Sequence, residues 1–289
     1  MKKIAFIVNP KSGQHRSQDR ARLIQSLVPE GLDYDILMWE KLEQKEELFK
    51  RALSGQYQIV AAAGGDGTVN TVAAALCGTD ISLAIIPFGS GNGLARHLNI
   101  PMDTGKALQL LKTGRERKID ACEINQKLFF CTAGAGFDAH IGKLFAESRN
   151  RGMRTYAQMI IRQIAAYKPL RYKLHIDGVV SEHEAFLITF ANAAQYGGNA
   201  YIAPLANIED GLIDISIIYP FPLLKGLLIA YRMFNKSLHH SHDVQLLRGK
   251  HIILERAEPG PVHYDGEPDT MGTRLEIKIL PSRLKVIVP

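Results

Sequence analysis

The chain has 289 residues, of which 46% are hydrophobic and 22% are charged, and its formal net charge is +6. This composition excludes intrinsic disorder and leaves room for one large domain or two ordinary domains. The positive balance favours an anionic partner, such as a nucleotide, a nucleic acid or lipid head groups, without choosing among them.

Along the first 120 residues, short apolar runs alternate with helical patterns. Such alternation predicts a parallel sheet that is covered by helices on both faces. We expect strands at Ile4–Val8, Tyr34–Trp39, Gln58–Ala63 and Ser82–Pro87, and helices at Asp19–Val28, Leu42–Leu53, Thr68–Leu76 and Gly105–Lys112.

Beyond Ile119 the pattern changes to short strands separated by turns such as Asp177-Gly178 and Asp265-Gly266, which is typical of an antiparallel β domain. Two helical stretches, near 140–167 and 222–238, interrupt it. We expect strands at Phe129–Ala133, Tyr172–Ile176, Ala185–Ala191, Ile213–Ile218, His251–Glu255, Val262–Tyr264 and Leu275–Ile279, while Lys285–Val288 could join either sheet.

The predicted organisation is therefore an α/β N-terminal domain with a parallel sheet over 1–120, which 281–289 could complete. A mostly antiparallel β-sandwich domain follows over 121–280. The apolar run Ile4–Val8 is too short for a secretory signal or a membrane-spanning helix, and proline and lysine interrupt the run Phe221–Tyr231. We therefore expect a cytoplasmic protein without a span. Cysteines without metal-ligand spacing fit that compartment; they are Cys77, Cys122 and Cys131.

The most informative segment joins the third expected strand to the following helix and reads Gly64-Gly65-Asp66-Gly67-Thr68. Glycines at such a junction let main-chain N–H groups approach a phosphate, and the helix N-terminus adds a positive partial charge. Asp66 suits such a site if it holds Mg²⁺ or accepts a proton from the attacking group. The simpler alternative is a tight turn with Thr68 as the helix N-cap.

Two more loops leave expected strands in the same sense, Asn9-Pro10-Lys11-Ser12-Gly13 and Phe88-Gly89-Ser90-Gly91-Asn92-Gly93. Loops at the carboxyl ends of neighbouring parallel strands meet in one crevice, so we expect all three to face one phosphate-bearing ligand. None has the spacing of a Walker A loop. Gly134–Ala139 fits a dinucleotide-binding spacing, but it comes late and lacks the later acid, so we interpret it as a turn near the domain boundary.

In combination, these loops resemble the three signature loops of the diacylglycerol kinase catalytic family, which includes bacterial soluble lipid kinases and sphingosine kinases. The resemblance continues through Asn192 with Gly197-Gly198, through Asp210-Gly211-Leu212-Ile213-Asp214 and through Tyr264-Asp265-Gly266-Glu267, so it covers nearly the whole chain. The first motif alone is shared with NAD kinases, whereas the combination is more specific.

The resemblance implies an ATP-dependent lipid kinase that uses Mg²⁺ and acts in lipid metabolism. It assigns Asp66 to the Mg²⁺–phosphate chemistry, Glu267 as the candidate general base, and Asp210 to a structural Mg²⁺ site with the main-chain carbonyls of Asn207 and Leu212. The residues that it implies for ATP binding are Asn9, Pro10, Lys11, Ser12, Gly13, Gly64, Gly65, Asp66, Gly67, Thr68, Val69, Asn70 and Ser90.

One position departs from the family pattern. Bacterial diacylglycerol kinases usually carry Asp after the loop asparagine, where this chain has Gly93, and sphingosine kinases have a small residue there. The substrate is therefore left open between diacylglycerol, a long-chain base and another lipid alcohol. Without the resemblance, Glu267 would be interpreted as an exposed turn acid and Asp210 as part of a hairpin turn.

A basic stretch over 143–173 holds eight Lys or Arg against one acid, Glu147, and indicates docking to an anionic membrane surface. Pro222–Lys236 could insert apolar side chains, although two ordinary surface helices are an equal alternative. We expect peripheral contact with the inner membrane face, no nucleic-acid partner, and a homodimer only as a possibility through an exposed sheet edge. Neighbouring histidines, which we interpret as helix-end residues, are His239, His240 and His242.

Two alternative functions remain at this stage. A kinase of a soluble substrate, such as NAD kinase, would share the loop around Asp66 but would not need the basic amphipathic stretches. A catalytically silent lipid- or nucleotide-binding protein is the other alternative, and Gly93 favours it slightly because it removes an acid from the expected site.

Overall fold

The computed structural model describes residues 2–9, 17–38, 44–148 and 153–289. The chain divides into two compact units, the N-terminal unit (Met1–Ile119 with Ser282–Pro289) and the C-terminal unit (Asp120–Pro281). Within the described residues, no helix combines the length and the apolar character that a bilayer crossing requires.

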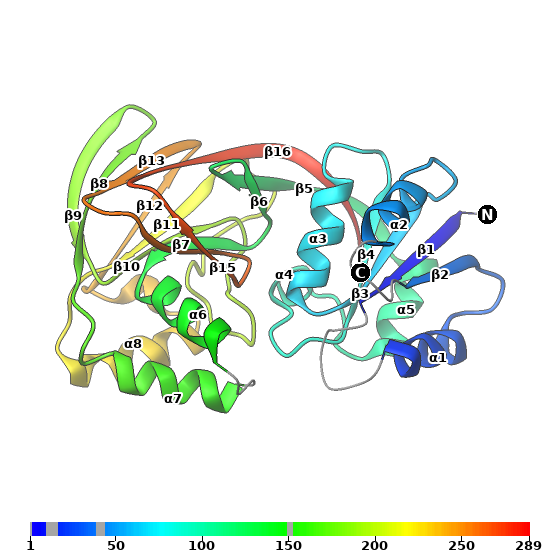
Figure 1. Ribbon diagram of the computed structural model, residues 1–289, viewed down its shortest axis with the longest axis horizontal. Coiled ribbons are helices and arrows are strands. Elements are labelled where there is room, and N and C mark those ends of the chain that lie inside the picture. The colour runs from blue at the N-terminus through cyan, green and yellow to red at the C-terminus, as the bar shows by residue number, and fades with distance from the viewer. Residues whose placement is uncertain (1, 10–16, 39–43, 149–152) are drawn as a thin grey trace. The chain divides into compact units, whose positions relative to one another are not determined.

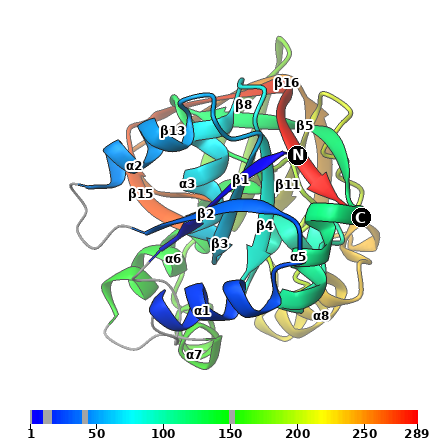
Figure 2. The same cartoon turned by 90° about the vertical axis from the view of Figure 1, so that its right-hand side faces the viewer.

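The N-terminal unit is a parallel sheet with helices on both faces (Figures 1 and 2). Its strands run in the order β2-β1-β3-β4-β16, and every neighbouring pair is parallel. The elements are β1 (Lys3–Val8), α1 (Ser17–Leu27), β2 (Asp33–Met38), α2 (Gln44–Ala52), β3 (Ile59–Gly64), α3 (Asp66–Leu76), β4 (Ser82–Pro87), α4 (Gly93–His97), α5 (Thr104–Thr113), and parts of β5 (Arg115–Ile124) and β16 (Arg274–Val288).

Burial explains why the central strands are continuous apolar runs. Every residue of β3 and β4 is buried, because α3 covers one face of the sheet and α1 and α5 lie on the other (Figure 2). Strands of parallel sheets that are buried on both faces lack polar alternation. The predicted strands and helices of this half are confirmed within the described residues, while Trp39 and residues 42–43, at the ends of two of them, lie outside those residues. The five-residue helix α4 was not expected.

The C-terminal unit contains two sheets that share one core. One is an antiparallel six-stranded sheet in the order β12-β11-β10-β7-β14-β15, and the other joins β16, β13, β8 and β9, with β5 and β6 at its side. Its elements are β6 (Lys127–Phe129), β7 (Thr132–Gly136), α6 (Phe137–Glu147), α7 (Met153–Gln163), β8 (Leu170–Ile176), β9 (Val179–Ala185), β10 (Leu187–Ala191), β11 (Ile213–Ile218), α8 (Leu223–Phe234), the 3₁₀ turn η1 (Leu238–His240), β12 (Val244–Gly249), β13 (His251–Arg256), β14 (Gly260–Tyr264) and β15 (Glu267–Met271).

Two hydrophobic clusters hold this unit together. The first lies between the sheets and joins residues such as Phe190 of β10 and Leu254 of β13, so the unit is a β-sandwich as predicted. The second lies under α6, α7 and α8 and includes Phe137 and Ile229. Because the six-stranded sheet has apolar neighbours on both faces, β10 and β11 are buried along their whole length.

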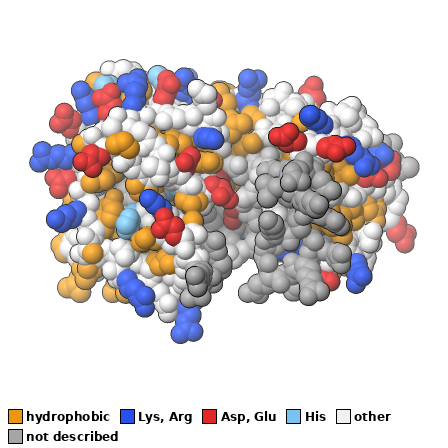
Figure 3. Space-filling model, viewed as in Figure 1, with side chains coloured by type: hydrophobic (Ala, Val, Ile, Leu, Met, Phe, Trp, Pro, Cys, Tyr) orange, Lys and Arg blue, Asp and Glu red, His pale blue; other side chains and the backbone are white. Residues whose placement is uncertain are grey.

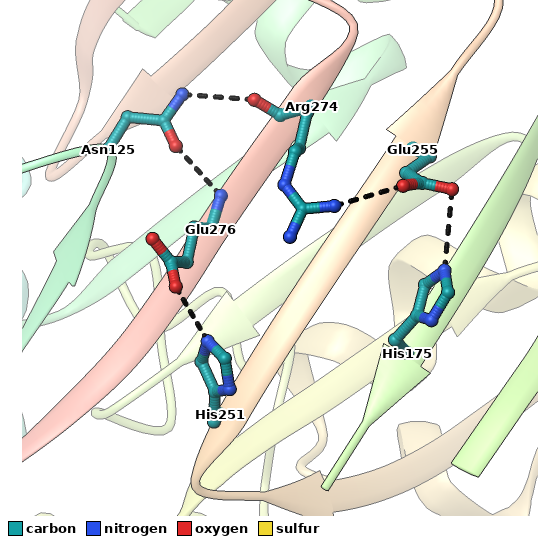
Figure 4. A network of polar contacts seen from close by, with 6 residues as sticks. All are labelled: Asn125, His175, His251, Glu255, Arg274 and Glu276. Carbon is teal, nitrogen blue, oxygen red and sulfur yellow. Dashed lines mark hydrogen bonds and ion pairs between the residues drawn. The ribbon is translucent and has the colours of Figure 1, made fainter. Parts of the chain in front are cut away.

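The other sheet has one polar face, which explains the alternating burial of β13. Figure 4 shows the side chains on that face, where His175 and Arg274 both contact Glu255, and His251 contacts Glu276 at 2.8 Å. The Asn125 side chain holds β16 by accepting from the Glu276 N–H and donating to the Arg274 carbonyl. These exposed pairs are worth little stability each, and they keep the outer face polar.

Two expectations need correction. Phe129–Ala133 is not one strand, because the chain leaves β6 after Phe129 and enters β7 at Thr132. Gly134–Ala139 is not a turn near the domain boundary, because it contains the end of β7 and the start of α6. Gly136, at φ 113°, makes that strand-to-helix junction, and a Cβ there would lie 2.7 Å from the Leu187 Cα.

Candidate active site

The first loop of the candidate site lies between β3 and α3. Gly65 is the N-cap residue of α3, and no side chain among the described residues caps this helix end, where main-chain N–H groups can meet an anion. A Cβ on Gly64 would overlap the Thr68 side chain, so only glycine fits there. Thr68 lies inside α3 and is buried, so it is not the N-cap of the simpler alternative.

The second loop lies between β4 and α4 and is closed by Asn92. This residue has a left-handed backbone (φ 50°) and is the N-cap of α4. Its side-chain amide donates to the Gly89 carbonyl at 2.7 Å, and its side-chain oxygen accepts from the Gly89 N–H at 3.1 Å. The Arg96 guanidinium donates to the Gly91 carbonyl at 2.9 Å. The loop is therefore held by its own polar groups.

These two loops touch each other directly. A Cβ on Gly89 would lie 2.6 Å from the Gly65 Cα, which real atoms cannot tolerate. The Asp66 carboxylate accepts from the Asn92 N–H at 2.9 Å and from the Gly93 N–H at 2.7 Å. The loops at the ends of β3 and β4 thus form one structure around Asp66, as predicted from their positions after neighbouring strands.

The end of β1 joins the same cluster. The Asn9 side-chain amide donates to the Thr68 hydroxyl at 3.3 Å. Arg20 of α1 is buried, donates to the Asn9 carbonyl at 3.3 Å, and lies 5.4 Å from the centre of the Phe88 ring. Residues Pro10 to Gly13, which the sequence also assigns to this loop, lie outside the described residues.

Two ionisable groups dominate the electrostatics of the cluster, the Asp66 carboxyl and the Arg20 guanidinium. Burial raises the pKa of the Asp66 carboxyl, although the hydrogen bonds from the Gly93 and Asn92 amides oppose that shift. Burial lowers the pKa of the Arg20 guanidinium. Arg20 was not expected from the sequence, because an arginine in an amphipathic helix gives no sign that it will be buried.

The remaining residues assigned to ATP differ in exposure. Ser90 is exposed at the tip of the second loop, and Gly67 and Asn70 are half-buried in the first turns of α3. The Val69 side chain is buried in the core, so only its main chain is available to a ligand.

The loop assigned to a structural metal is in the C-terminal unit. Its turn is closed by the Asp210 carboxylate, which accepts from the Leu212 N–H at 3.0 Å, and by the Asn207 carbonyl, which accepts from the Asp210 N–H at 3.4 Å. The buried Asp120 carboxylate accepts from the Gly211 N–H at 2.8 Å and anchors the loop to β5.

The chemistry around this loop suits a hard cation. The buried Asp214 oxygen Oδ2 has no hydrogen-bond partner among the described residues, and burial, with the Asp210 charge as a lesser cause, raises the pKa of the Asp214 carboxyl. Arg248 balances only the other oxygen of Asp214, at 2.8 Å. Carboxylate and carbonyl oxygens are the ligands of Mg²⁺ and Ca²⁺. Among the described residues, no three His, Cys, Asp or Glu side chains form a metal cluster.

Glu267 stands at the start of β15, directly after the turn that Asp265 and Gly266 make with positive φ angles. The Asp265 carboxylate accepts from the N–H groups of Phe130, Cys131 and Thr132 at 2.8, 2.8 and 3.0 Å. The turn is thereby tied to the segment between β6 and β7. Glu267 itself is exposed, and its charge is one cause of the raised pKa of Tyr264, after burial and Asp269.

The structure also contains a buried polar cluster that sequence reasoning missed. Asp138, in the first turn of α6, accepts from Tyr196 at 2.9 Å and Thr189 at 3.2 Å and contacts the His263 ring at 2.9 Å. Burial raises the pKa of Tyr196 well above its ordinary value. A Cβ on Gly134 would lie 2.6 Å from Asp138, so this glycine makes room for the cluster, which ties α6 to β14.

An α/β unit with glycine loops gathered at the carboxyl ends of its strands, followed by a β-sandwich, is the architecture that the resemblance to the diacylglycerol kinase catalytic family implies. The profile described as "Diacylglycerol kinase catalytic domain" matches residues 3–124, and that described as "YegS C-terminal NAD kinase beta sandwich-like domain" matches residues 131–288. The chain belongs to the YegS-like family of lipid kinases, which combines these two domains, and the resemblance drawn from the motifs is confirmed.

Named relatives are similar along most of the chain. A Pseudomonas aeruginosa protein named "Probable lipid kinase YegS-like" is 31% identical, over 87% of this chain and 83% of its own length. A Mycobacterium tuberculosis protein named "Diacylglycerol kinase" is 29% identical, over 99% of this chain and 95% of its own length.

Solved structures share the fold. One from Bacillus anthracis has a TM-score of 0.79 at 26% identity and covers 100% of this chain and 98% of its own. A second from the same organism, described as a diacylglycerol kinase, has a TM-score of 0.75 at 22% identity, over 100% of this chain and 97% of its own.

Proposed function

We propose that the protein transfers the γ-phosphoryl group of ATP to the hydroxyl of a lipid, of the diacylglycerol or long-chain-base type, at the cytoplasmic surface of the membrane. The observation that carries this proposal is the contact between the loops after β3 and β4 around Asp66, with Asn9 of β1 beside them. The names of the relatives support the lipid class of the substrate.

In this proposal the N-terminal unit holds the nucleotide. The start of α3 and the glycines before it offer main-chain N–H groups to the phosphates, and a charge at such a helix end gains about 0.3–1 kcal/mol. The buried Arg20 adds positive potential beneath Asn9. Asn9 to Gly13, Gly64 to Asn70 and Ser90 are the proposed ATP-binding residues.

The reaction needs a proton acceptor. The lipid hydroxyl oxygen forms a bond to the γ-phosphorus, the bond from that phosphorus to the oxygen of ADP breaks, and the hydroxyl proton passes to a carboxylate. Asp66 and Glu267 are the proposed acceptors, and a positioned base contributes a factor of about 10²–10⁴ in rate. The Asn92 and Gly93 amides would hold Asp66 in place.

Mg²⁺ fits the oxygen-lined loop at Asp210, where the Asn207 and Leu212 carbonyls would complete the ligands from the chain. A bound cation there would offset the negative charge of Asp210 and of the Asp214 oxygen that has no partner in the described part of the chain. Mg²⁺ on the ATP phosphates would neutralise charge that develops during transfer. We propose the C-terminal unit as the lipid-binding domain.

A lipid panel tests this proposal. The protein is incubated with labelled ATP, Mg²⁺ and detergent-dispersed diacylglycerol, a sphingoid base, phosphatidylglycerol or a polyprenol, and label in the lipid fraction is measured. We expect transfer to at least one lipid and a loss of at least about 10³-fold in Asp66→Asn. Asp103→Asn is the matched control, because asparagine also caps the helix that Asp103 begins.

Three outcomes would contradict parts of this proposal. Transfer to NAD in the absence of lipid would favour a kinase of a soluble substrate. ATP binding without transfer to any acceptor would favour a silent binding protein. Normal turnover by Asp66→Asn would remove Asp66 from the chemistry while leaving the lipid kinase activity in place.

A further inference from the structure

Helix α8 presents a large apolar surface to solvent. Large apolar side chains on its outer face are between 49% and 86% exposed; they are Leu223, Leu224, Leu227, Leu228, Tyr231 and Phe234. Their spacing places them on one face of the helix. Figure 3, drawn from the same side as Figure 1, shows hydrophobic side chains at the lower left, where α8 lies. Isolated exposed leucines are normal, but a continuous stripe of this kind marks an interaction surface.

The opposite face of α8 already has its partners. Gly226 lies close to Ile164 and Phe221, since a Cβ on this glycine would be 3.3 Å from either side chain. Ile229 is buried in the cluster beneath the helix, and Met233 packs against that cluster. The helix is therefore docked on its own unit, and its outer stripe is not needed for that docking.

Helix α7 differs from α8 in what it exposes. Its Tyr156, Met159 and Ile160 pack inward against the same cluster, so they are unavailable for insertion into a membrane. Ile161 is its one large apolar side chain exposed among the described residues, and Arg154 and Arg162 are exposed as well. In the described part of the basic stretch, this helix therefore offers charge rather than an apolar surface.

The surroundings of the apolar stripe are basic. Lys225 on α8 and Lys236 directly after it are exposed, Arg232 is half-buried, and the sequence has no acid between Phe221 and His242. The first acid after the helix, Asp243, pairs with Lys225 at 2.9 Å. The stretch from Met153 to Lys173 also has no acid.

We propose that α8 lies in the plane of an anionic phospholipid bilayer, with its apolar stripe among the acyl chains and the flanking cations at the head groups. A helix with an apolar face beside Lys and Arg is the pattern that binds membrane interfaces. A second copy of the chain is a poorer occupant, because a two-fold contact would bring the same cations against each other. The functional reason for this docking rests on the proposed lipid substrate, whereas binding to vesicles can be measured without any kinase activity.

Vesicle co-sedimentation without nucleotide tests this inference. The wild type, Leu224→Gln/Leu227→Gln and Val179→Gln/Val180→Gln are mixed with vesicles of phosphatidylcholine and phosphatidylglycerol at 3:1, or of phosphatidylcholine alone. We expect the wild type to bind the anionic vesicles and the α8 variant to bind them at least about tenfold more weakly. The Val179/Val180 control changes two exposed apolar residues at the β8–β9 turn and should bind as the wild type does.

Other results would overturn the inference. Equal binding by the α8 variant would show that another surface docks. A wild type that dimerises without lipid, and an α8 variant that does not, would assign the stripe to a second copy. Phosphate transfer to detergent-dispersed lipid by a wild type that ignores vesicles would overturn the docking and leave the proposed function intact. Vesicle binding without transfer to any lipid would support the docking and remove the proposed function.

Discussion

Asp66 illustrates how much a single carboxylate can hold in this protein. Its two oxygens accept one amide each from Asn92 and Gly93, so the acid fixes the loop that packs against its own. The same burial that protects these hydrogen bonds raises the pKa of Asp66 above its ordinary value of 3.8. A proton acceptor with a raised pKa is a stronger base, which suits a residue that takes the proton of a hydroxyl.

The pH dependence of turnover separates the two candidate bases. If Asp66 is the acceptor, kcat/KM rises with pH as Asp66 ionises, and the midpoint of that acid limb lies above 3.8. Glu267→Gln should then keep the limb at the same midpoint. Disappearance of the limb in Glu267→Gln, with a change in kcat rather than KM, would assign the base to Glu267 instead.

The pH dependence of stability tests the same raised pKa of Asp66, and stability falls with rising pH where kcat/KM rises. The folded state holds the Asp66 proton more tightly than the unfolded state, so this contribution to the free energy of unfolding falls as pH rises from 3.8 through the folded pKa. Asp66→Asn cannot ionise, so its Tm relative to that of the wild type should rise across this interval. A difference that stays constant with pH would show that Asp66 ionises as in the unfolded chain.

The residues of the first glycine loop could be predicted from sequence, because glycines and an acid at a strand-to-helix junction are a recognisable pattern. The hydrogen-bond partners of the chain's buried acids could not be predicted. Asp138 meets His263 from a position 125 residues earlier in the chain, and Asp265 meets Phe130 across 135 residues. Residue type shows that an acid can accept hydrogen bonds, but only the folded chain decides which donors reach it.

At the scale of elements, the N-terminal unit depends on how closely two loops approach. A methyl group on Gly89 has no space beside Gly65, one on Gly65 would lie a tight 3.3 Å from the Gly89 Cα, and one on Gly91 would lie 2.7 Å from the Asp66 carboxylate. Backbone, unlike the end of a long side chain, cannot move aside cheaply. The glycines therefore allow the loops at the ends of β3 and β4 to lie in direct contact.

Gly89→Ala should separate these loops. The added Cβ would lie 2.6 Å from the Gly65 Cα and 2.7 Å from the Asn92 Oδ1. We expect a loss of about 1–3 kcal/mol in the free energy of unfolding and ATP binding at least about tenfold weaker, measured by denaturant titration and calorimetry. Gly105→Ala, where the nearest atom is at an ordinary 3.4 Å, should leave ATP binding unchanged. Equal ATP affinity in both variants would contradict a role for the loop contact.

Elements that carry their own pattern were predicted, and those that depend on neighbours were missed. The apolar runs β1, β3 and β4 were evident, whereas β5 begins with four polar or charged residues and β15 contains proline and two acids. Both strands form because β16 and β14 offer them pairing partners. The single strand β16 was expected as two pieces, because Pro281 and Ser282 interrupt its apolar pattern.

At the scale of the whole molecule, the chain passes between the units twice, each time within a strand. β5 begins in the N-terminal unit and ends in the C-terminal unit, and β16 runs the other way. Leu275 and Ile277 of β16 pair with β13, while Val286 pairs with Leu83 of β4. The N-terminal sheet is thus completed by residues from the far end of the described chain.

Truncation after Pro281 should therefore damage the N-terminal unit. It removes Leu284, Val286 and Val288, which are fully or almost fully buried, and burying one such side chain contributes about 1.5–3 kcal/mol. This loss is comparable to the whole stability of a typical domain. We therefore expect little soluble truncated protein, and we expect the soluble fraction neither to bind ATP nor to unfold in a cooperative thermal transition. Lys285→Ala is the control and should cost at most about 1 kcal/mol, because its partner Asp80 is exposed. Unchanged melting of the truncated chain would contradict this account.

The pairing of β4 with β16 has a consequence for biosynthesis. β4 leaves the ribosome long before residues 282–288 do, and at ordinary elongation rates the interval is on the order of ten seconds or more. Throughout that time the nascent polypeptide carries an open hydrogen-bonding edge beside Leu83, which is a surface that invites pairing with foreign strands. The first half of the protein to be translated is therefore the last to finish its sheet.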